Sequence, residues 1–305
     1  HVEAGAQAAR EARADLLVGL GGGSAMDCAK GVNFLVSNGG RVEDYWGFGK
    51  AKRPMLPSIG IPTTAGTGSE AQSYALISQA GSHRKMACGD RKARFQGVLL
   101  DPAVLATVPR EVMAVSGFDA LAHALESFVC TRANPISRLL SKEAWALLAS
   151  AFLQVLTEPE DPRARARMLL GAFLAGAAIE KSMLGLAHSC ANPLTARYGV
   201  VHGAAVGLML PAVVRFNGPE VEGLYGELLG ASGVANDGSG SAAQLSDLLA
   251  GLRESAGLPA RLQQVGVEAA RLPTLAGEAA EQWTAQFNPR AAGVDELLRL
   301  YESAY

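Results

Sequence analysis

The sequence predicts an α/β domain over residues 1–108 and an all-helical domain over residues 109–305. In the first hundred residues, short apolar runs end in turns rich in glycine or proline, as strands do before they pass into helices. From Pro109 onward, Ala- and Leu-rich segments of helical period follow one another, separated by Gly, Pro and Asn. A chain of 305 residues is long enough to bury a large core in two such domains.

The α/β domain is expected to begin with a helix and to contain several short strands. Residues 1–13 have the composition of the middle or end of a helix. The apolar run 15–20 leads through a glycine cluster into a second helix, which makes a strand–turn–helix unit. The other expected elements are that second helix over 25–37 and strands over 55–61, 74–78 and 97–100.

The helical domain is expected to start at Pro109, because the fixed φ of proline suits a first helical residue. Its clearest helices are expected over 135–156, 163–183 and 202–216. The most apolar stretch, residues 168–179, ends at a Glu-Lys pair and is too short to span a bilayer, so we interpret it as a buried helix. An exposed loop is expected over 233–241, with Ser241 and Gln244 forming a capping box at the next helix.

Composition indicates a globular enzyme. Hydrophobic residues make up 49% and charged residues 18%, as in soluble globular proteins. The net charge of −2, with both signs interspersed, predicts no nucleic-acid partner and no membrane partner. Four cysteines stand far apart without a C-x-x-C pair, and no signal peptide is visible, which together predict a reduced, cytoplasmic protein.

A glycine cluster marks a candidate phosphate-binding turn. Gly19-Leu-Gly-Gly-Gly-Ser24 follows an expected strand and opens an expected helix. Glycines allow close approach of the backbone to a phosphate, and the free N–H groups at a helix start attract it. The cluster is neither a complete G-x-G-x-x-G nor a Walker A motif, so a tight turn without a ligand is the alternative.

A second loop strengthens the interpretation as a cofactor site. Thr63-Thr-Ala-Gly-Thr67 also follows an expected strand and offers hydroxyl groups and small residues. Two such loops at the strand ends of one sheet are what a dinucleotide site requires. The first domain is therefore predicted to be a Rossmann-like dinucleotide-binding domain.

A carboxylate and three imidazoles in the helical domain are candidate metal ligands. Asp119 and His123 are four residues apart, which places both on one helix face. His188 and His202 lie among small or apolar residues, as His123 does. Such a set suits Fe²⁺ or Zn²⁺ and leaves a position for a substrate oxygen. Taken alone, the Asp119–His123 pair is better explained by a surface ion pair or by a core histidine hydrogen-bonded to an aspartate.

These motifs together resemble the iron-containing (group III) alcohol dehydrogenases of the dehydroquinate synthase-like superfamily, from about residue 5 to the C-terminus. The resemblance is carried by four stretches in the same order: Gly21-Gly-Gly-Ser-Ala-Met-Asp-Cys-Ala-Lys30, Pro62-Thr-Thr-Ala-Gly-Thr-Gly-Ser-Glu70, Asp119-Ala-Leu-Ala-His-Ala-Leu-Glu126, and His188 followed by His202-Gly203.

The resemblance implies a role for each matching residue. The implied metal ligands are Asp119, His123, His188 and His202. Gly22, Gly23, Ser24 and Asp27 would lie at the pyrophosphate and nicotinamide of NAD or NADP. The other implied cofactor contacts are Thr63, Thr64 and Thr67 in the domain cleft, Lys85 at the ribose, and Val104 to Val108 on the adenine side.

The activity implied is metal-dependent hydride transfer between an alcohol and nicotinamide, or the reverse reduction of an aldehyde or ketone. A small alcohol or carbonyl compound is the expected partner, together with further copies of the chain in a homodimer or larger assembly. The sequence leaves the alcohol, the metal and the choice between NAD and NADP open.

Two features depart from the family pattern. Many members have a histidine four residues after the third ligand, where this chain has Asn192. Asparagine cannot act as a base, so Asn192 is expected to orient the substrate while the proton leaves through water or the ribose hydroxyls. The family's chain also begins earlier, with a strand–helix–strand unit, so the dinucleotide-binding domain is expected to be truncated here.

Two alternatives stay open at this stage. One is a related activity of the superfamily, such as a glycerol dehydrogenase or a maleylacetate reductase; the presence of all four ligands argues against the metal-free reductases. The other is a catalytically silent, truncated metal-binding domain that serves as an oligomer partner. Cofactor binding separates the two classes, because a silent chain would hold metal without binding dinucleotide.

Overall fold

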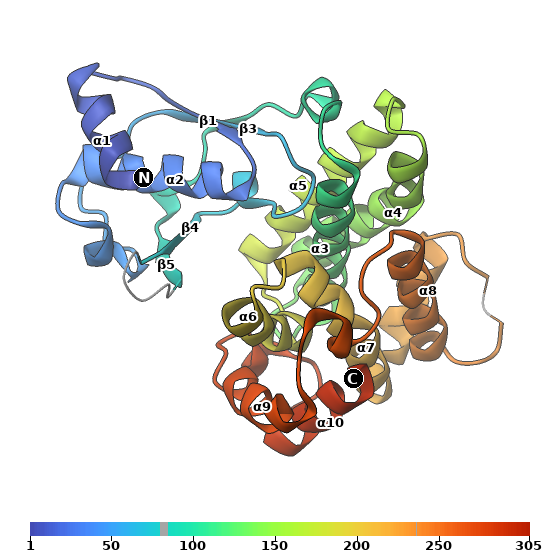
Figure 1. Ribbon diagram of the computed structural model, residues 1–305. Coiled ribbons are helices and arrows are strands. Elements are labelled where there is room, and N and C mark those ends of the chain that lie inside the picture. The colour runs from blue at the N-terminus through green and yellow to red at the C-terminus, as the bar shows by residue number, and fades with distance from the viewer. Residues whose placement is uncertain (80–84, 236) are drawn as a thin grey trace.

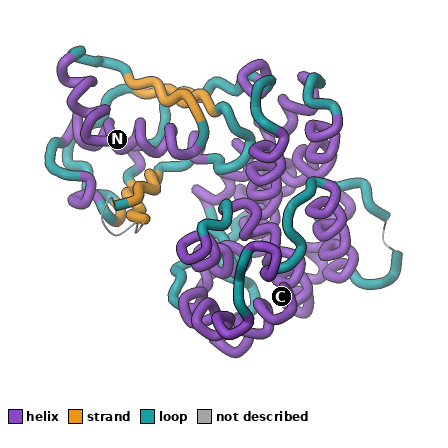
Figure 2. The backbone as a smooth tube through the Cα atoms, in the orientation of Figure 1, coloured by secondary structure: helices purple, strands orange, loops and turns teal. Residues whose placement is uncertain are grey.

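A computed structural model describes residues 1–79, 85–235 and 237–305. It has an N-terminal α/β unit beside a larger helical unit (Figure 1). Within the described residues, strands occur only in the first of these units (Figure 2). The predicted fold class, an α/β Rossmann-like unit followed by a helical one, is confirmed.

The first sheet is parallel and places two strand ends side by side. Its strands are β1 (Leu17–Gly21), β3 (Ser58–Pro62) and β6 (Gly97–Val98), in the order β1-β3-β6. Gly21 lies opposite Pro62, so β1 and β3 end at the same edge. Helix α1 (Val2–Glu11) precedes β1, and helix α2 (Gly23–Asn38) follows it directly. The loops after β1 and β3 therefore begin next to each other.

A second, mixed sheet was not expected from the sequence. It contains β2 (Gly47–Phe48), β5 (Lys85–Gly89) and β4 (Tyr74–Ser78), in that order. β4 was predicted with the observed bounds, whereas no strand was predicted at β5 and a single sheet was expected. β4 and β5 pair antiparallel, from Tyr74 opposite Gly89 to Ser78 opposite Lys85.

The helical unit surrounds one central helix. α3 (Arg110–Val129) packs against α4 (Pro135–Thr157), α5 (Pro162–Lys181) and α7 (His202–Ala231). Every α3 residue from Gly117 to Val129 is buried. The remaining helices are α6 (Leu186–Tyr198), α8 (Ser241–Ser255), α9 (Leu272–Ala280) and α10 (Val294–Ala304).

Helix starts follow the sequence in some places and differ in others. Asn134 caps α4 by accepting hydrogen bonds from the N–H groups of Ile136 and Ser137, and a proline follows at the first helical position. α3 instead begins at Arg110, with Pro109 as the residue before it. The predicted capping box at α8 is wrong, because the N–H groups of Ser241 and Ala242 donate to the Glu222 carboxylate of α7.

The helix starting at His202 is longer than predicted. A helix over residues 202–216 was expected, because Asn217-Gly218-Pro219 is a sequence typical of a helix end. The chain instead bends at Val221, whose φ of −136° and ψ of 24° are not helical, and continues to Ala231. Asn217 and Val221 are both buried, so tertiary packing stabilises the continuation of the helix beyond the bend.

The two units meet through backbone contacts between glycines. Gly68, which follows the second loop, has φ +61°, and a Cβ there would lie 2.6 Å from the Cα of Gly176 in α5. A Cβ at Gly176 would lie 2.3 Å from the Gly68 carbonyl oxygen. Nearby, the Ser73 N–H donates to Glu180 Oε2 at 3.0 Å. Glycine is needed on both sides of this junction.

Within the part of the chain that the structure describes, two helices have the length and hydropathy of a membrane span, and neither was predicted from the sequence to have them. They are α3 and α4, and the pair α5 and α6, bent by 105°, would qualify together. In the fold, 83% of the apolar window of α3 and 44% of that of α4 are buried inside the protein. The predicted helix over 168–179 lies within α5 and is largely buried. The absence of a membrane partner stays a prediction.

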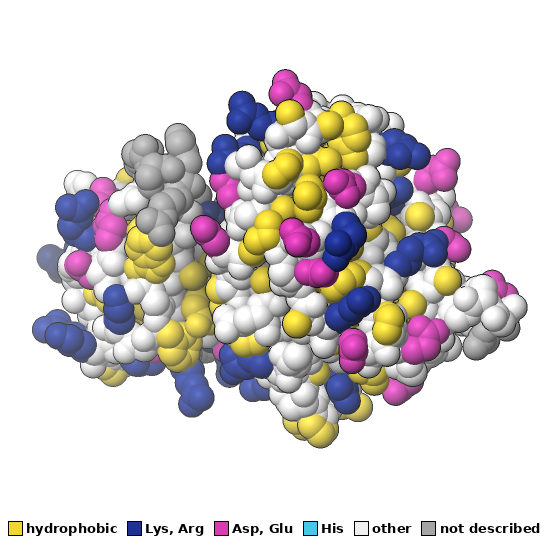
Figure 3. Space-filling view, turned by 90° about the horizontal axis from the view of Figure 1, so that it is seen from below, with side chains coloured by type: hydrophobic (Ala, Val, Ile, Leu, Met, Phe, Trp, Pro, Cys, Tyr) yellow, Lys and Arg dark blue, Asp and Glu magenta, His cyan; other side chains and the backbone are white. Residues whose placement is uncertain are grey.

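Charged and apolar side chains are mixed on the surface. The face shown in Figure 3 carries basic and acidic groups of both signs among apolar ones. This agrees with a net charge of −2 spread along the chain.

Candidate metal and cofactor site

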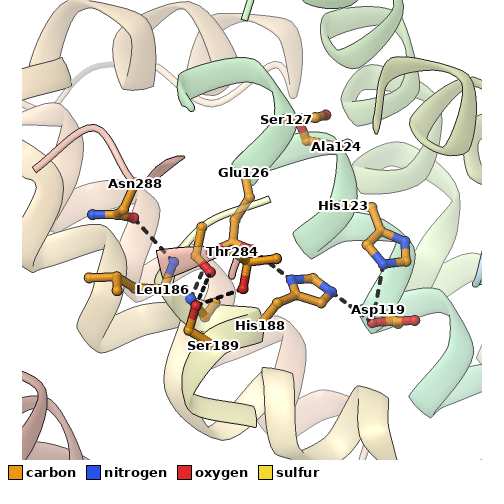
Figure 4. Close-up of polar contacts among 12 residues, drawn as sticks. Asp119, His123, Ala124, Glu126, Ser127, Leu186, His188, Ser189, Thr284 and Asn288 are labelled. Carbon is orange, nitrogen blue, oxygen red and sulfur yellow. Dashed lines mark hydrogen bonds and ion pairs between the residues drawn. The ribbon is translucent and has the colours of Figure 1, made fainter. Parts of the chain in front are cut away.

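Three helices bring the predicted ligands together around one carboxylate oxygen. Asp119 and His123 lie one turn apart on α3, His188 is the third residue of α6, and His202 is the first residue of α7. The Nε2 atoms of His123, His188 and His202 lie 3.6, 3.4 and 3.8 Å from Asp119 Oδ1. Figure 4 shows Asp119, His123 and His188 pointing toward one another. We call these four residues the histidine–aspartate cluster.

The rings are arranged around a common point. His123 and His188 are stacked, with ring centroids 4.8 Å apart, and the centroids of His188 and His202 are 5.4 Å apart. Ligand atoms of Asp119, His188 and His202 all lie within 4.8 Å of one another. Nitrogen and oxygen donors at this spacing suit a divalent transition metal.

The cluster leaves buried polar atoms unpartnered, which is the test of fit for a metal. Asp119 Oδ1 and His188 Nε2 are buried and have no hydrogen-bond partner within the described part of the chain. An unpartnered buried polar atom costs about 1–3 kcal/mol, and more when the group is charged. Both atoms face the centre of the cluster, so a cation there would give each a partner. The residues fit a metal ion.

The pKa values of the cluster follow from burial and from its carboxylates. Burial alone would raise the pKa of Asp119, but the neighbouring histidines hold that pKa well below its usual range. Burial lowers the pKa of His123, and it lowers the pKa of His202 to about 4. Both rings are therefore neutral near pH 7, with lone pairs available for a metal.

His188 differs from the other two histidines. Burial would lower its pKa, but the contacts with Asp119 and Glu126 and the negative charges of these two groups outweigh burial and raise the pKa of His188 to about 9 in the metal-free protein. His188 Nδ1 lies 2.6 Å from Glu126 Oε2, and the Ala187 N–H donates to Glu126 Oε1 at 2.7 Å. Figure 4 shows His188 between Glu126 and Asp119.

Glu126 was not assigned a role from the sequence. It is buried on α3, seven residues after Asp119. The spacing of Asp119, His123 and Glu126 at i, i+4 and i+7 places all three on one helix face, and this signal was available in the sequence.

The predicted phosphate turn and the threonine loop pack directly on each other. A Cβ at Gly23 would lie 2.6 Å from Thr67 Cγ2, and a Cβ at Gly22 would lie 3.3 Å from Thr64 Oγ1. The Thr63 N–H donates to the Gly21 carbonyl at 2.9 Å. Gly22 precedes α2 without a capping side chain, so no side chain of the N-cap residue occupies the start of the helix, where a phosphate would bind.

Ser24 and Asp27 line a pocket of about 310 Å³ beside this turn, between α1, α2 and β4. The Asp27 carboxylate is already engaged by the protein. Ser69 Oγ donates to Asp27 Oδ1 at 2.5 Å, and the Leu76 N–H donates to Asp27 Oδ2 at 3.0 Å. Lys30 Nζ lies 3.6 Å from the same carboxylate and donates to the Ser69 and Tyr74 carbonyls. Asp27 thus joins α2 to the second sheet.

The other predicted residues lie on other segments of the chain. Lys85 is the exposed first residue of β5, and its charge helps to lower the pKa of His202. Val104 and Val108 are half-buried against the apolar core of the helical unit. Asn192, one turn after His188 on α6, donates to Gln282 Oε1 at 3.0 Å. The roles assigned to these residues in cofactor or substrate binding stay predictions.

Two family models match the chain. The model of iron-containing alcohol dehydrogenase covers residues 1–102, and the model of the Fe-containing alcohol dehydrogenase family, C-terminal, covers residues 113–305.

Individual relatives are similar over nearly the whole chain. The NAD-dependent methanol dehydrogenase of Bacillus methanolicus is 31% identical over 99% of this chain and 80% of its own. Alcohol dehydrogenase 4 of Schizosaccharomyces pombe is 32% identical over 100% of this chain and 72% of its own. The chain therefore spans about 80% of the first relative and 72% of the second.

Solved structures share the fold. A 1,3-propanediol oxidoreductase superimposes with a TM-score of 0.95 at 27% identity, covering 100% of this chain and 80% of that one. The sulfoacetaldehyde reductase of Bifidobacterium kashiwanohense in complex with NAD⁺ gives a TM-score of 0.88 at 25% identity, covering 99% and 79%.

Proposed function

Because the chain belongs to the iron-containing alcohol dehydrogenase family, we propose that it transfers hydride between an alcohol and a nicotinamide cofactor held beside the histidine–aspartate cluster. The single observation that carries the proposal is the convergence of three imidazole nitrogens on the buried, unpartnered Oδ1 of Asp119. Iron and NAD are supported by the family and by the names of relatives, with Zn²⁺ and NADP as the remaining options.

Asp119, His123, His188 and His202 are the proposed metal ligands. When bound, a divalent ion would act as a Lewis acid on the oxygen of the alcohol or carbonyl substrate. Asp119 contributes a full negative charge, since its pKa is held low, while His123 and His202 contribute neutral rings. The cluster is nearly closed to solvent, apart from the His202 side chain, which is 29% exposed. We propose that substrate approaches on that side.

The glycine turn and the threonine loop are the proposed cofactor site. Gly22, Gly23 and Ser24 would offer backbone N–H groups to the pyrophosphate at the start of α2. Thr63, Thr64 and Thr67 would flank the same cofactor from the adjacent strand end. Asp27 lines the pocket at this turn, and Lys85 carries its charge toward His202.

Further roles are proposed at the edges of the site. Val104 and Val108 are proposed to lie on the adenine side, and residues 1–108 and 109–305 are proposed as the domains. Asn192 cannot accept a proton from the alcohol, so we propose that it orients the substrate through its amide. The proton then leaves through water or the ribose hydroxyls of the cofactor.

We also propose a homodimer or larger assembly in the cytoplasm. All four cysteines are free, and three of them are buried, which suits a reducing compartment. Size-exclusion chromatography with light scattering would test the assembly, and a mass equal to that of one 31.6 kDa chain would contradict it.

The proposal is tested by titrating the metal-loaded 305-residue chain with NADH and then NADPH, following nucleotide fluorescence. Saturable binding, followed by turnover of short alcohols that stops on metal removal, is the expected result. Retention of metal without nucleotide binding would contradict the proposed dehydrogenase function.

A further inference from the structure

We propose that Glu126 is a positioning residue for the metal centre, fixing the orientation and the proton of His188 while anchoring the start of α6. The inference rests on the proposed function, because it concerns a ligand of the proposed metal. Glu126 lies on α3 and His188 on α6, so a single carboxylate ties two helices of the histidine–aspartate cluster together.

The first step is the proton on the imidazole. His188 Nδ1 lies 2.6 Å from Glu126 Oε2, a distance typical of a short, charge-assisted hydrogen bond. A carboxylate can only accept, so Nδ1 carries the proton. With Nδ1 protonated, the neutral ring that remains when a metal displaces the second proton has its lone pair on Nε2, 3.4 Å from Asp119 Oδ1. This is the tautomer that a metal ligand requires.

The second step is the start of α6. No side chain of α6 or of its N-cap residue Gly185 caps this helix. Its first N–H groups are satisfied from elsewhere, since Leu186 donates to Asn288 Oδ1 at 3.2 Å and Ala187 donates to Glu126 Oε1 at 2.7 Å. A negative carboxylate at a helix start is also favoured by the helix dipole. His188 is the next residue, so the carboxylate that contacts its ring also holds the backbone immediately before it.

The third step is that both carboxylate oxygens of Glu126 already have a hydrogen-bond partner. Oε1 is used by Ala187 and Oε2 by His188. A glutamine has one acceptor oxygen, which the Ala187 N–H would keep. Its NH₂ group would then face His188 Nδ1 and donate to it, forcing the imidazole proton onto Nε2. Glu126→Gln therefore keeps the shape of the side chain but gives His188 the tautomer that cannot bind metal through Nε2.

The test measures metal binding directly, without relying on activity. The apo forms of wild type and Glu126→Gln are titrated with Co²⁺, following the visible d–d absorption, and with Zn²⁺ in competition with a chelator. We expect Glu126→Gln to bind metal roughly 10- to 100-fold more weakly and to show altered Co²⁺ bands. Unchanged affinity and unchanged bands would overturn the proposal.

Asn288→Ala is the matched control, because it removes the other acceptor at the start of α6 and leaves the Glu126–His188 contact in place. It should lower the melting temperature of the apo protein without changing metal affinity or the Co²⁺ bands. If Asn288→Ala weakens metal binding as much as Glu126→Gln does, the effect is one of helix capping, and the assignment of Glu126 to the histidine tautomer is wrong.

Glu126→Asp provides a second variant in case the glutamine protein does not fold. It keeps the charge but is one methylene shorter, so the contacts with Ala187 and His188 cannot both persist, and metal affinity should fall. Wild-type affinity and bands in Glu126→Asp would count against the proposal. The wild-type titration separates this result from the proposed function, because a wild type that binds no divalent metal refutes the metal site itself.

Discussion

At the scale of single residues, the members of the histidine–aspartate cluster differ in their surroundings. Asp119, His123 and His188 are buried within the helical unit, whereas the His202 side chain is 29% exposed. Removing a partly exposed ring leaves a smaller cavity than removing a buried one. His202 is therefore the ligand whose loss separates metal binding from folding most cleanly.

His202→Ala should remove stoichiometric metal and abolish turnover while leaving helical content unchanged. The reason is that His202 supplies one of four donors directly, so its loss should exceed the roughly 10- to 100-fold effect of a supporting residue. Metal analysis after gel filtration and far-UV circular dichroism check both parts. Full metal occupancy in the variant would show that His202 is not a ligand.

Asn192→His should introduce a pH dependence into alcohol oxidation that the wild type lacks. A histidine near its ordinary pKa of about 6.5 accepts a proton only above that pH, so turnover should rise as pH increases through this region. The measurement is the pH profile of kcat for both proteins. Coincident profiles would mean that this position takes no part in proton transfer.

At the scale of elements, the sequence predicted those parts whose signal is local. β4 was predicted with its observed bounds, and Asp119 and His123 were placed together by helical period alone. The Glu222 contact that starts α8 and the glycine contact between Gly68 and Gly176 depend on residues distant in the chain. Glu126 is an intermediate case. Its position on the same helix face as Asp119 follows from the local sequence, but its contact with His188 on α6 depends on a residue distant in the chain.

Gly23→Ala tests the contact between the glycine turn and the threonine loop. The new Cβ would lie 2.6 Å from Thr67 Cγ2, so the loop must move or the start of α2 must tilt. We expect NADH affinity to fall by about tenfold or more, with metal binding unchanged, since such a shift misplaces several contacts at once. Nucleotide fluorescence titration and metal analysis measure the two effects.

Gly251→Ala is the control for this experiment. It lies in α8, where a Cβ would meet nothing within 4 Å, so it should keep NADH affinity and gain a little helix stability. Equal NADH affinity in Gly23→Ala and Gly251→Ala would mean that the turn does not hold the cofactor.

At the scale of the whole molecule, the junction of the two units contains buried charge. Glu70 lies two residues after Gly68 and is 3% exposed, and burial raises its pKa from 4.5 to about 7. Lys30, whose own pKa is lowered by burial, opposes that shift, and Asp27 adds to it. Glu70 is thus easier to protonate in the folded protein than in the unfolded chain.

This sets the sign of a pH effect on stability. The raised pKa means that the folded state binds more protons than the unfolded state between about pH 4.5 and 7, so the stability contributed by Glu70 is present below 4.5 and lost as pH rises through 7. Glu70→Gln should remove a decline on the order of 1–3 kcal/mol across this window. Urea unfolding at several pH values measures it, and parallel curves for both proteins would contradict the prediction.

The contact of Gly68 with Gly176 has a mechanical consequence. Where two structural units contact each other through side chains, changes of rotamer accommodate small displacements of one unit relative to the other. Here the backbone of Gly68 contacts the backbone of Gly176 in α5, with no side chain between these two residues. The spacing between the proposed nicotinamide site and the histidine–aspartate cluster is then set by peptide geometry, which is far stiffer than packing. The rate of hydride transfer changes when the donor–acceptor distance changes by fractions of an ångström. The contact of Gly68 with Gly176 limits how closely the proposed nicotinamide site and the histidine–aspartate cluster can approach each other.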